Sequence, residues 1–244
     1  MTFVPGWDSA RRWDPVKPPK VSVVRIVCIS DTHTQASHVT IPVCDILIHA
    51  GDITYRGEQD KLQAFNDWGG KLHLPKERKI CIAGNHDISF RTEPEAARST
   101  LTHWTYLEDS VTEVCGLKIY GTPWSPNFYP ESWVFNQSRG AEAAARWSQI
   151  PEDTDILVVH GPPFGYGDRL NHDRASRTRP HVGCVDLLHR LEKVRPKLTV
   201  CGHVHEDRGV FAAPWGTVVN ACVMTSEYKP KGKPIIIDLP VIMS

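Results

Sequence analysis

The chain has 244 residues, with 28 Lys and Arg against 28 Asp and Glu, so its formal net charge at neutral pH is zero. Its 41% hydrophobic and 23% charged residues lie in the globular range and argue against bulk disorder. The balanced charge argues against a surface that coats long nucleic acid, and no run approaches the roughly 18 apolar residues of a membrane-spanning helix.

Residues 1–20 form a proline-rich arm, with prolines at positions 5, 15, 18 and 19. This arm has no apolar stretch of the kind that a secretory signal needs. Seven cysteines follow without any C-x-x-C pair, and several of them lie inside apolar runs. Such cysteines are typical of buried small side chains in a reducing compartment, so we expect a cytoplasmic protein.

After the arm, short apolar runs that predict buried strands alternate with longer amphipathic stretches that predict helices. The predicted strands are residues 21–29, 45–49, 79–83, 116–120, 155–160 and 198–201, and the predicted helices are 59–72, 139–149 and 182–194. Strand signals at 209–212, 217–221 and 234–239 predict a terminal antiparallel meander. This alternation, with no linker-like gap, predicts a single α/β domain over residues 21–244.

Polar, metal-competent side chains follow five of the predicted strands, often beside a glycine. In chain order they are Asp31, His33, Asp52, Asn85, His86, His160, His203 and His205. Ligands of α/β sheets bind outside the carboxyl ends of the strands, so we expect these side chains to form one site.

The residue types at these positions favour two metal ions. Residues two apart on an extended chain point to the same side, so Asp31 and His33 can chelate one cation together. The pair His203 and His205 could also straddle two cations about 3.5–4 Å apart. Two carboxylates, one amide and four imidazoles exceed the needs of one tetrahedral zinc. Mixed oxygen and imidazole ligation suits two divalent ions of Mn, Fe or Zn, of which we favour Mn.

The five motifs in this order resemble the signature of the calcineurin-like metallophosphoesterases. They are Asp31-x-His33, Gly51-Asp52, Gly84-Asn85-His86, His160-Gly161 and Gly202-His203-x-His205. Over nearly its whole length the chain is also similar to a branch of small eukaryotic metallophosphoesterase-domain-containing proteins. The similar stretches are FNDWGGKL, HGPPFGYGD, VGCVDLL, RPKLTVCGHVHE and PIIIDLP.

This resemblance implies a four-layer α/β/β/α sandwich of two facing mixed sheets flanked by helices. In the family pattern, one metal is held by Asp31, His33, Asp52 and His205, and the other by Asp52, Asn85, His160 and His203. His86 matches the non-ligand histidine beside the scissile phosphate. Some members of the branch lack the first histidine of the last motif, whereas this chain keeps His203, so an active enzyme is expected.

The resulting hypothesis is a dinuclear phosphodiesterase that hydrolyses small phosphodiesters, with cyclic nucleotides as the expected substrates. A hydroxide that bridges the metals would attack phosphorus, and His86 would protonate the leaving alkoxide. Two alternatives stay open: a phosphomonoesterase or phosphatase, and a metal-loaded nucleotide-binding scaffold with negligible turnover. Neither long nucleic acid nor a membrane is expected as a partner, and protein partners are unknown.

Several residues near the predicted site could contact the substrate or have a structural role instead. The candidate substrate contacts are Asn85, His86, His172, Asp173 and Glu206. His86 could instead be a further metal ligand or a structural hydrogen-bond donor. His49 is expected to contact a ligand residue rather than the metal itself. The loop of residues 164–181 either leans over the metals or is solvated. The aromatic segment of residues 124–135 could stack a nucleobase, but packing is favoured; it holds Trp124, Phe128, Tyr129, Trp133 and Phe135.

Overall fold

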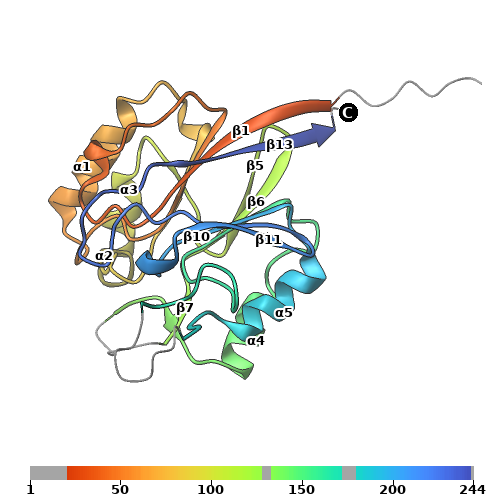
Figure 1. Ribbon diagram of the computed structural model, residues 1–244. Helices are drawn as coiled ribbons and strands as arrows, with labels where there is room; N and C mark the ends of the chain where they lie inside the picture. The colour runs from red at the N-terminus through yellow and green to blue at the C-terminus, as the bar shows by residue number, and fades with distance from the viewer. Residues whose placement is uncertain (1–20, 128–132, 172–179, 243–244) are drawn as a thin grey trace, which may run out of the picture.

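The computed structural model describes residues 21–127, 133–171 and 180–242 (Figure 1). The N-terminal arm lies outside these ranges, as do the candidate contacts His172 and Asp173 and the aromatic residues Phe128 and Tyr129. No helix in the described ranges is long and apolar enough to cross a lipid bilayer. All seven cysteines are free thiols, and five of them are buried.

Two large mixed sheets form the centre of the fold. The strand order of the first sheet is β13 (Ile235–Ile242), β1 (Val21–Ile29), β2 (Ile46–Ala50), β3 (Lys79–Ile82) and β4 (Thr105–Tyr106). Here β1 to β4 run parallel, and β13 pairs antiparallel with β1. The order of the second sheet is β11 (Gly209–Ala213), β12 (Gly216–Asn220), β10 (Leu198–Cys201), β9 (Ile156–Val159), β6 (Leu117–Thr122) and β5 (Ser110–Val114). Its outer strands β11 and β5 are antiparallel to their neighbours, and its four inner strands are parallel.

Apolar side chains fill the space between the two sheets. Alternate residues of β1, such as Ile26 and Cys28, point into this layer, because successive side chains of a strand face opposite ways. Ile156, Val158 and Val200 of the second sheet belong to the same core cluster. Every residue of β2, β3, β9 and β10 is buried, since both faces of these strands are covered.

Helices cover the outer face of each sheet. The first sheet packs against α1 (Gln59–Gly70), α2 (Ser89–Thr92) and α3 (Pro94–Thr100), and the second against α4 (Ala141–Trp147) and α5 (Val185–Val194). In α5 the buried residues are Leu187, Leu191 and Val194, which recur at the spacing of one helix face. The four-layer α/β/β/α fold is therefore confirmed. The short elements are η1 (Ala36–His38), η2 (Lys76–Arg78), η3 (His205–Asp207) and the small sheet of β7 (Ser125–Pro126) and β8 (Asn136–Gln137).

The predicted terminal meander is wrong. Strands β11 and β12 form an antiparallel hairpin, but β12 is parallel to β10, and β13 returns to the other sheet beside β1. The reason is the burial pattern of β13, an edge strand in which Leu239 and Val241 are buried and Ile236 and Pro240 are exposed. An edge strand tolerates proline, and its alternating apolar side chains complete the layer between the sheets.

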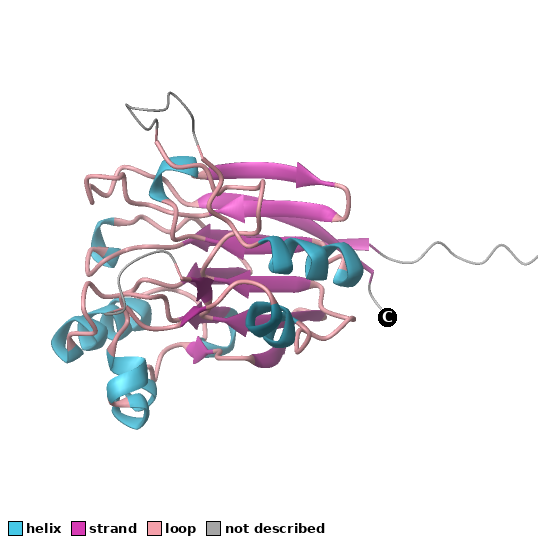
Figure 2. Ribbon diagram, turned by 90° about the horizontal axis from the view of Figure 1, so that it is seen from below, coloured by secondary structure: helices cyan, strands magenta, loops and turns pink. Residues whose placement is uncertain are grey.

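The parallel strands of both sheets point to the same edge of the sandwich. Figure 2 shows their arrowheads on one side of the molecule, where long loops continue from them. These loops carry the polar residues that the motifs single out.

Candidate metal centre

Backbone hydrogen bonds bind the loops at this edge to one another. The amide of Asp31 donates to the carbonyl of Gly51 (2.9 Å), and the amide of His33 donates to the carbonyl of Asp52 (3.1 Å). In the second sheet, the amide of Gly202 donates to the carbonyl of His160 (3.0 Å). The amide of Val223 donates to the carbonyl of Ser30 (3.0 Å) and so joins the ends of the two sheets.

Four of the predicted ligands have left-handed backbone conformations. The φ angles are 54° at Asp31, 39° at His33, 54° at Asp52 and 69° at His203. The extended chain expected from Asp31 to His33 is therefore wrong. Asp31 lies in one candidate cation group with His205, and His33 lies in another with Asp52. A left-handed conformation costs roughly 1–2 kcal/mol for a residue with a Cβ, and it persists where the surrounding structure over-determines it, most often at functional sites.

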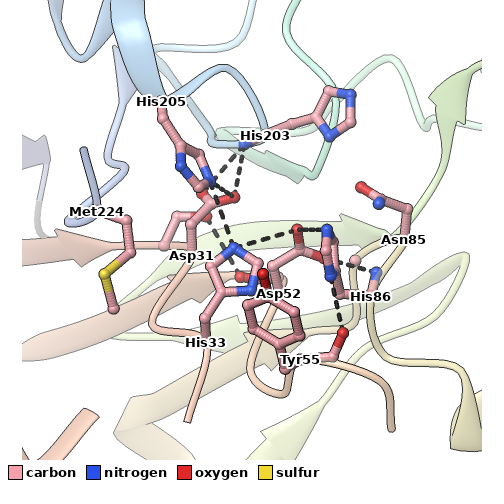
Figure 3. Close-up of polar contacts among 12 residues, drawn as sticks. Asp31, His33, Asp52, Tyr55, Asn85, His86, His203, His205 and Met224 are labelled. Atoms are coloured by element: carbon pink, nitrogen blue, oxygen red, sulfur yellow. Dashed lines mark hydrogen bonds and ion pairs between the residues drawn. The ribbon is translucent and has the colours of Figure 1, made fainter. Parts of the chain in front are cut away.

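Most of the predicted ligands fall into three groups that could each hold a cation (Figure 3). They are Asp31 with His205 and Cys222, Asp52 with His33 and His86, and Asp52 with His160 and His203. Asp52 Oδ2 lies 3.7 Å from His33 Nε2, and Asp52 Oδ1 lies 3.4 Å from His160 Nε2. Asp52 thus belongs to two of the three groups, as a bridging carboxylate must. On one side, Asp31 Oδ1 lies 3.4 Å from His205 Nε2. On the other, His203 can share a cation with Asp52 and His160.

Four imidazoles in this centre are each oriented by a backbone carbonyl. The Nδ1 atom of each ring is hydrogen-bonded to such an oxygen: His33 to Thr54 (3.2 Å), His86 to Tyr55 (2.8 Å), His160 to Ala50 (2.9 Å) and His205 to Thr225 (3.1 Å). A carbonyl only accepts, so Nδ1 carries the proton, and Nε2 of a neutral ring presents a lone pair. Such contacts fix the tautomer and the ring orientation of metal-binding histidines.

Some of the candidate ligand atoms lie close to one another in contacts that a divalent cation between them would stabilise. The Nε2 atoms of His33 and His205 face each other at 3.3 Å, although neither has a proton to share in the neutral ring. His160 Nε2 lies 3.0 Å from the Asn85 amide oxygen, and the Asn85 amide nitrogen has no partner among the described residues. Facing lone pairs are stabilised by a cation between them, and nitrogen with carboxylate and amide oxygen suits Mn, Fe or Zn.

The charges of the centre are strongly coupled. Burial raises the pKa of Asp52, but the opposing effect of His160 and His86 holds it well below its ordinary value. Burial lowers the pKa of His160, but the carboxylate of Asp52 outweighs this and raises it to about 9. A metal must therefore displace a proton from His160, so metal affinity should increase with pH.

Two glycines of the motifs leave room for these carboxylates. A Cβ on Gly84 would lie 2.2 Å from Asp52 Oδ1, and a Cβ on Gly202 would lie 2.1 Å from Asp31 Oδ2. Any side chain at either position would displace a ligand carboxylate. The glycines of the G-N-H and G-H-x-H motifs are thus explained by close approach.

Sequence reasoning missed two groups next to the ligands. The buried Asp87 carboxylate accepts hydrogen bonds from the amides of Ile53, Thr54 and Gly84, and so ties the loop after β2 to the loop after β3. Its place directly after the G-N-H motif was an available signal. The thiol of Cys222 lies within 4.8 Å of ligand atoms of Asp31 and His205, and nothing in the sequence indicated this contact.

Two further residues named in the sequence analysis lie next to the candidate ligands without belonging to them. His49 Nε2 is hydrogen-bonded to the hydroxyl of Thr32 (2.9 Å), between the ligands Asp31 and His33. Glu206 follows His205 on η3 and is partly buried; within the described ranges no hydrogen bond joins it to the ligands.

The aromatic segment divides into two parts. Trp124 packs edge-to-face on the buried Phe135 at 5.5 Å, as expected for packing. Trp133 instead lies against His86, with 4.1 Å between the ring centroids.

Comparison with known proteins finds a matching family profile and similar sequences. A sequence profile described as calcineurin-like phosphoesterase matches residues 24–207. Metallophosphoesterase domain-containing protein 1 of Homo sapiens is 41% identical over 251 residues, which cover 93% of this chain and 74% of that protein. A UPF0046 protein of Caenorhabditis elegans is 36% identical over 257 residues, which cover 96% of this chain and 89% of that protein.

Solved structures with low sequence identity share the fold. One is TT1561 of Thermus thermophilus, with a TM-score of 0.54 at 14% identity, covering 82% of this chain and 89% of that chain. Another is the phosphopantetheinyl hydrolase of Mycobacterium tuberculosis, with a TM-score of 0.54 at 14% identity, covering 86% of this chain and 95% of that chain.

We expect Asp52→Asn to lose metal and activity, because a neutral amide balances less of the charge of two cations. The losses of metal affinity and of activity should each exceed the roughly 10–100-fold that is typical when a residue hydrogen-bonded to a metal ligand is replaced. Elemental analysis after dialysis, together with turnover of a phosphodiester, measures both effects. Asp238→Asn is the matched control, since Asp238 pairs with Arg25 on the surface. Two metals per chain and normal turnover in Asp52→Asn would show that this carboxylate is not a bridge.

His203→Gly should weaken one metal by at least about 10–100-fold and leave the other bound. The fold should survive, because glycine adopts the left-handed conformation of residue 203 freely and keeps the amide that donates to Asp31 (3.0 Å). Metal titration and thermal unfolding of the variant test this expectation. An unchanged stoichiometry with an unchanged rate would remove His203 from the ligand set.

Gly84→Ala should lower metal affinity although it removes no ligand, because the new Cβ would displace the Asp52 carboxylate. The comparison variant is Gly209→Ala, whose Cβ would approach only the ring of Phe211, at 3.3 Å. Both variants are compared by metal titration. Equal affinities would mean that the close approach at Gly84 does not position Asp52.

Proposed function

The chain belongs to the calcineurin-like phosphoesterase family of metal-dependent phosphoester hydrolases, and on that premise we propose that it hydrolyses small phosphodiesters, with cyclic nucleotides as its substrates. The family uses two metal ions, and this chain has the His and Asp groups to hold them. The metal that we propose is Mn. A cytoplasmic location is proposed as well, and the seven free thiols support it.

The ligand set divides between two metal positions that share Asp52. We assign Asp31, His33, Asp52 and His205 to the first position, and Asp52, Asn85, His160 and His203 to the second. When bound, two such ions supply an acidified water and positive charge at the phosphoryl group. The chain itself must orient the ligands and supply the proton that the leaving group needs.

The observation that carries the proposal is the placement of His86. Its Nδ1–H donates to the carbonyl of Tyr55, so Nε2 is the atom that can hold and release a further proton. This Nε2 atom lies 3.9 Å from Asp52 Oδ2, and the residue is 8% exposed, so it can face a substrate bound at the ligand cluster. The amide of His86 donates to Asp52 Oδ1 (2.9 Å), which couples its position to that of the bridging carboxylate.

A proton donor at this place favours diester hydrolysis with a poor leaving group. The departing alkoxide of a nucleoside takes the Nε2 proton as its bond to phosphorus breaks. Because His86 also lies near His33 and Asp52, the role of a further metal ligand is the competing assignment. The zero net charge supports a small substrate rather than long nucleic acid.

One substrate screen separates the three candidate functions. Mn-loaded protein is assayed with bis-p-nitrophenyl phosphate, p-nitrophenyl phosphate, and 2′,3′- and 3′,5′-cyclic nucleotides. The proposal expects hydrolysis of the diesters and cyclic nucleotides in preference to the monoester. Preference for p-nitrophenyl phosphate would support the phosphomonoesterase, and full metal content with no turnover would support the scaffold.

His86→Ala should slow a cyclic nucleotide by about 10²–10⁴-fold, the usual range for a general acid. It should slow bis-p-nitrophenyl phosphate much less, because p-nitrophenolate leaves without a proton. Both rates are measured on protein whose two metals are verified by elemental analysis. Similar losses on both substrates would indicate charge stabilisation alone, and loss of a metal would make His86 a ligand.

A further inference from the structure

Aromatic side chains from separate loops surround the histidines of the metal centre. The ring of Tyr228, from the loop after β12, lies 4.9 Å from the ring of His33 and 5.1 Å from that of His205. The ring of Tyr55, from the loop after β2, lies 5.6 Å from both His33 and His86 and 5.3 Å from Tyr228. We call Tyr55 and Tyr228 the tyrosine pair.

Packing accounts for Tyr228 better than it accounts for Tyr55. Tyr228 is partly buried against the two histidines, whereas Tyr55 leaves 40% of its surface in water. The exposed part of the Tyr55 ring, beside His86, is free to stack on a further flat partner. Figure 3 shows Tyr55 next to His33 and His86, at the side of the ligand cluster.

The backbone of each tyrosine is held in place by hydrogen bonds. The amide of Tyr55 donates to Glu58 (3.2 Å), and its carbonyl accepts from His86 (2.8 Å). Tyr228 has a left-handed φ of 56°, which is unfavourable for an aromatic residue; its amide donates to Thr225 (2.8 Å). Strain of this kind is retained where the position of a side chain is useful.

The charge around the tyrosine pair suits an anionic ligand with an aromatic ring. The guanidinium of Arg56, next to Tyr55 in the chain, lies 5.3 Å from the ring centroid of Trp133, which covers His86. Positive charge and flat apolar rings therefore border the same side of the centre.

We propose that the tyrosine pair binds the nucleobase of a nucleotide whose phosphate lies at the metal centre, and that Tyr55 supplies the exposed stacking face. This inference rests on the proposed function, since it names the part of the substrate that the centre itself does not contact. Stacking of a base on an aromatic side chain contributes about 1–3 kcal/mol. Removal of the ring should therefore weaken binding by about 5- to 150-fold.

The test compares ligands with and without a base. Mn-loaded wild type, Tyr55→Ala and Tyr55→Phe are assayed with adenosine 2′,3′-cyclic phosphate and with the base-free ribose 2′,3′-cyclic phosphate. Tyr55→Ala should raise KM for the adenosine compound about 5- to 150-fold more than it raises KM for the ribose compound. Tyr55→Phe keeps the ring and should keep the ratio of the two KM values at that of wild type. Val111→Ala, at a similarly exposed apolar residue of β5, is the surface control.

A binding measurement separates this inference from the proposed function. Calorimetry with AMP and with ribose 5-phosphate should show tighter binding of AMP by wild type, and Tyr55→Ala should lose that preference. If wild type hydrolyses neither cyclic phosphate but shows the preference, the phosphodiesterase proposal fails and the base site stands. Equal effects of Tyr55→Ala on both members of each pair, or no effect on either, would overturn the base site.

Discussion

Two buried carboxylates facing a ring of imidazoles are the constraint on which the rest of the structure depends. Asp31 and Asp52 are almost fully buried, and buried charges are costly unless partners compensate them. Here the partners come from both sheets: His33 follows β1, while His160 and His205 follow β9 and β10. The carboxylates are therefore stable only where the carboxyl ends of both sheets meet.

The local irregularities of the loops follow from this requirement. Left-handed residues turn the ligands inward, and glycines such as Gly84 leave space for the carboxylates. Asp87 ties two of the loops together through backbone amides. The sandwich supports this strain because its apolar layers fix the strands from which the loops begin.

Holding metal and acting on a substrate are distinct tasks at this centre. The carbonyls of Thr54, Ala50 and Thr225 orient the proposed ligand histidines, and the carbonyl of Tyr55 does the same for His86. One short loop after β2 thus contains the proposed bridging carboxylate, orients the proposed general acid and presents an exposed aromatic ring. Catalytic geometry and substrate contact are coupled through its backbone.

The sequence by itself determined the α/β class, the candidate ligands and the strands of the two large sheets except β4 and β5, because apolar runs and motif residues are local patterns. Asp31, His160 and His203 were recognisable from their positions after such runs. Tertiary structure alone decided that β13 joins the first sheet, and that Asp31 and His33 lie on a left-handed rather than an extended chain. It also decided that Cys222 and the tyrosine pair border the centre. These features depend on contacts between distant segments, such as Ser30 with Val223, or on the space that packing leaves for each side chain, and no local pattern records either.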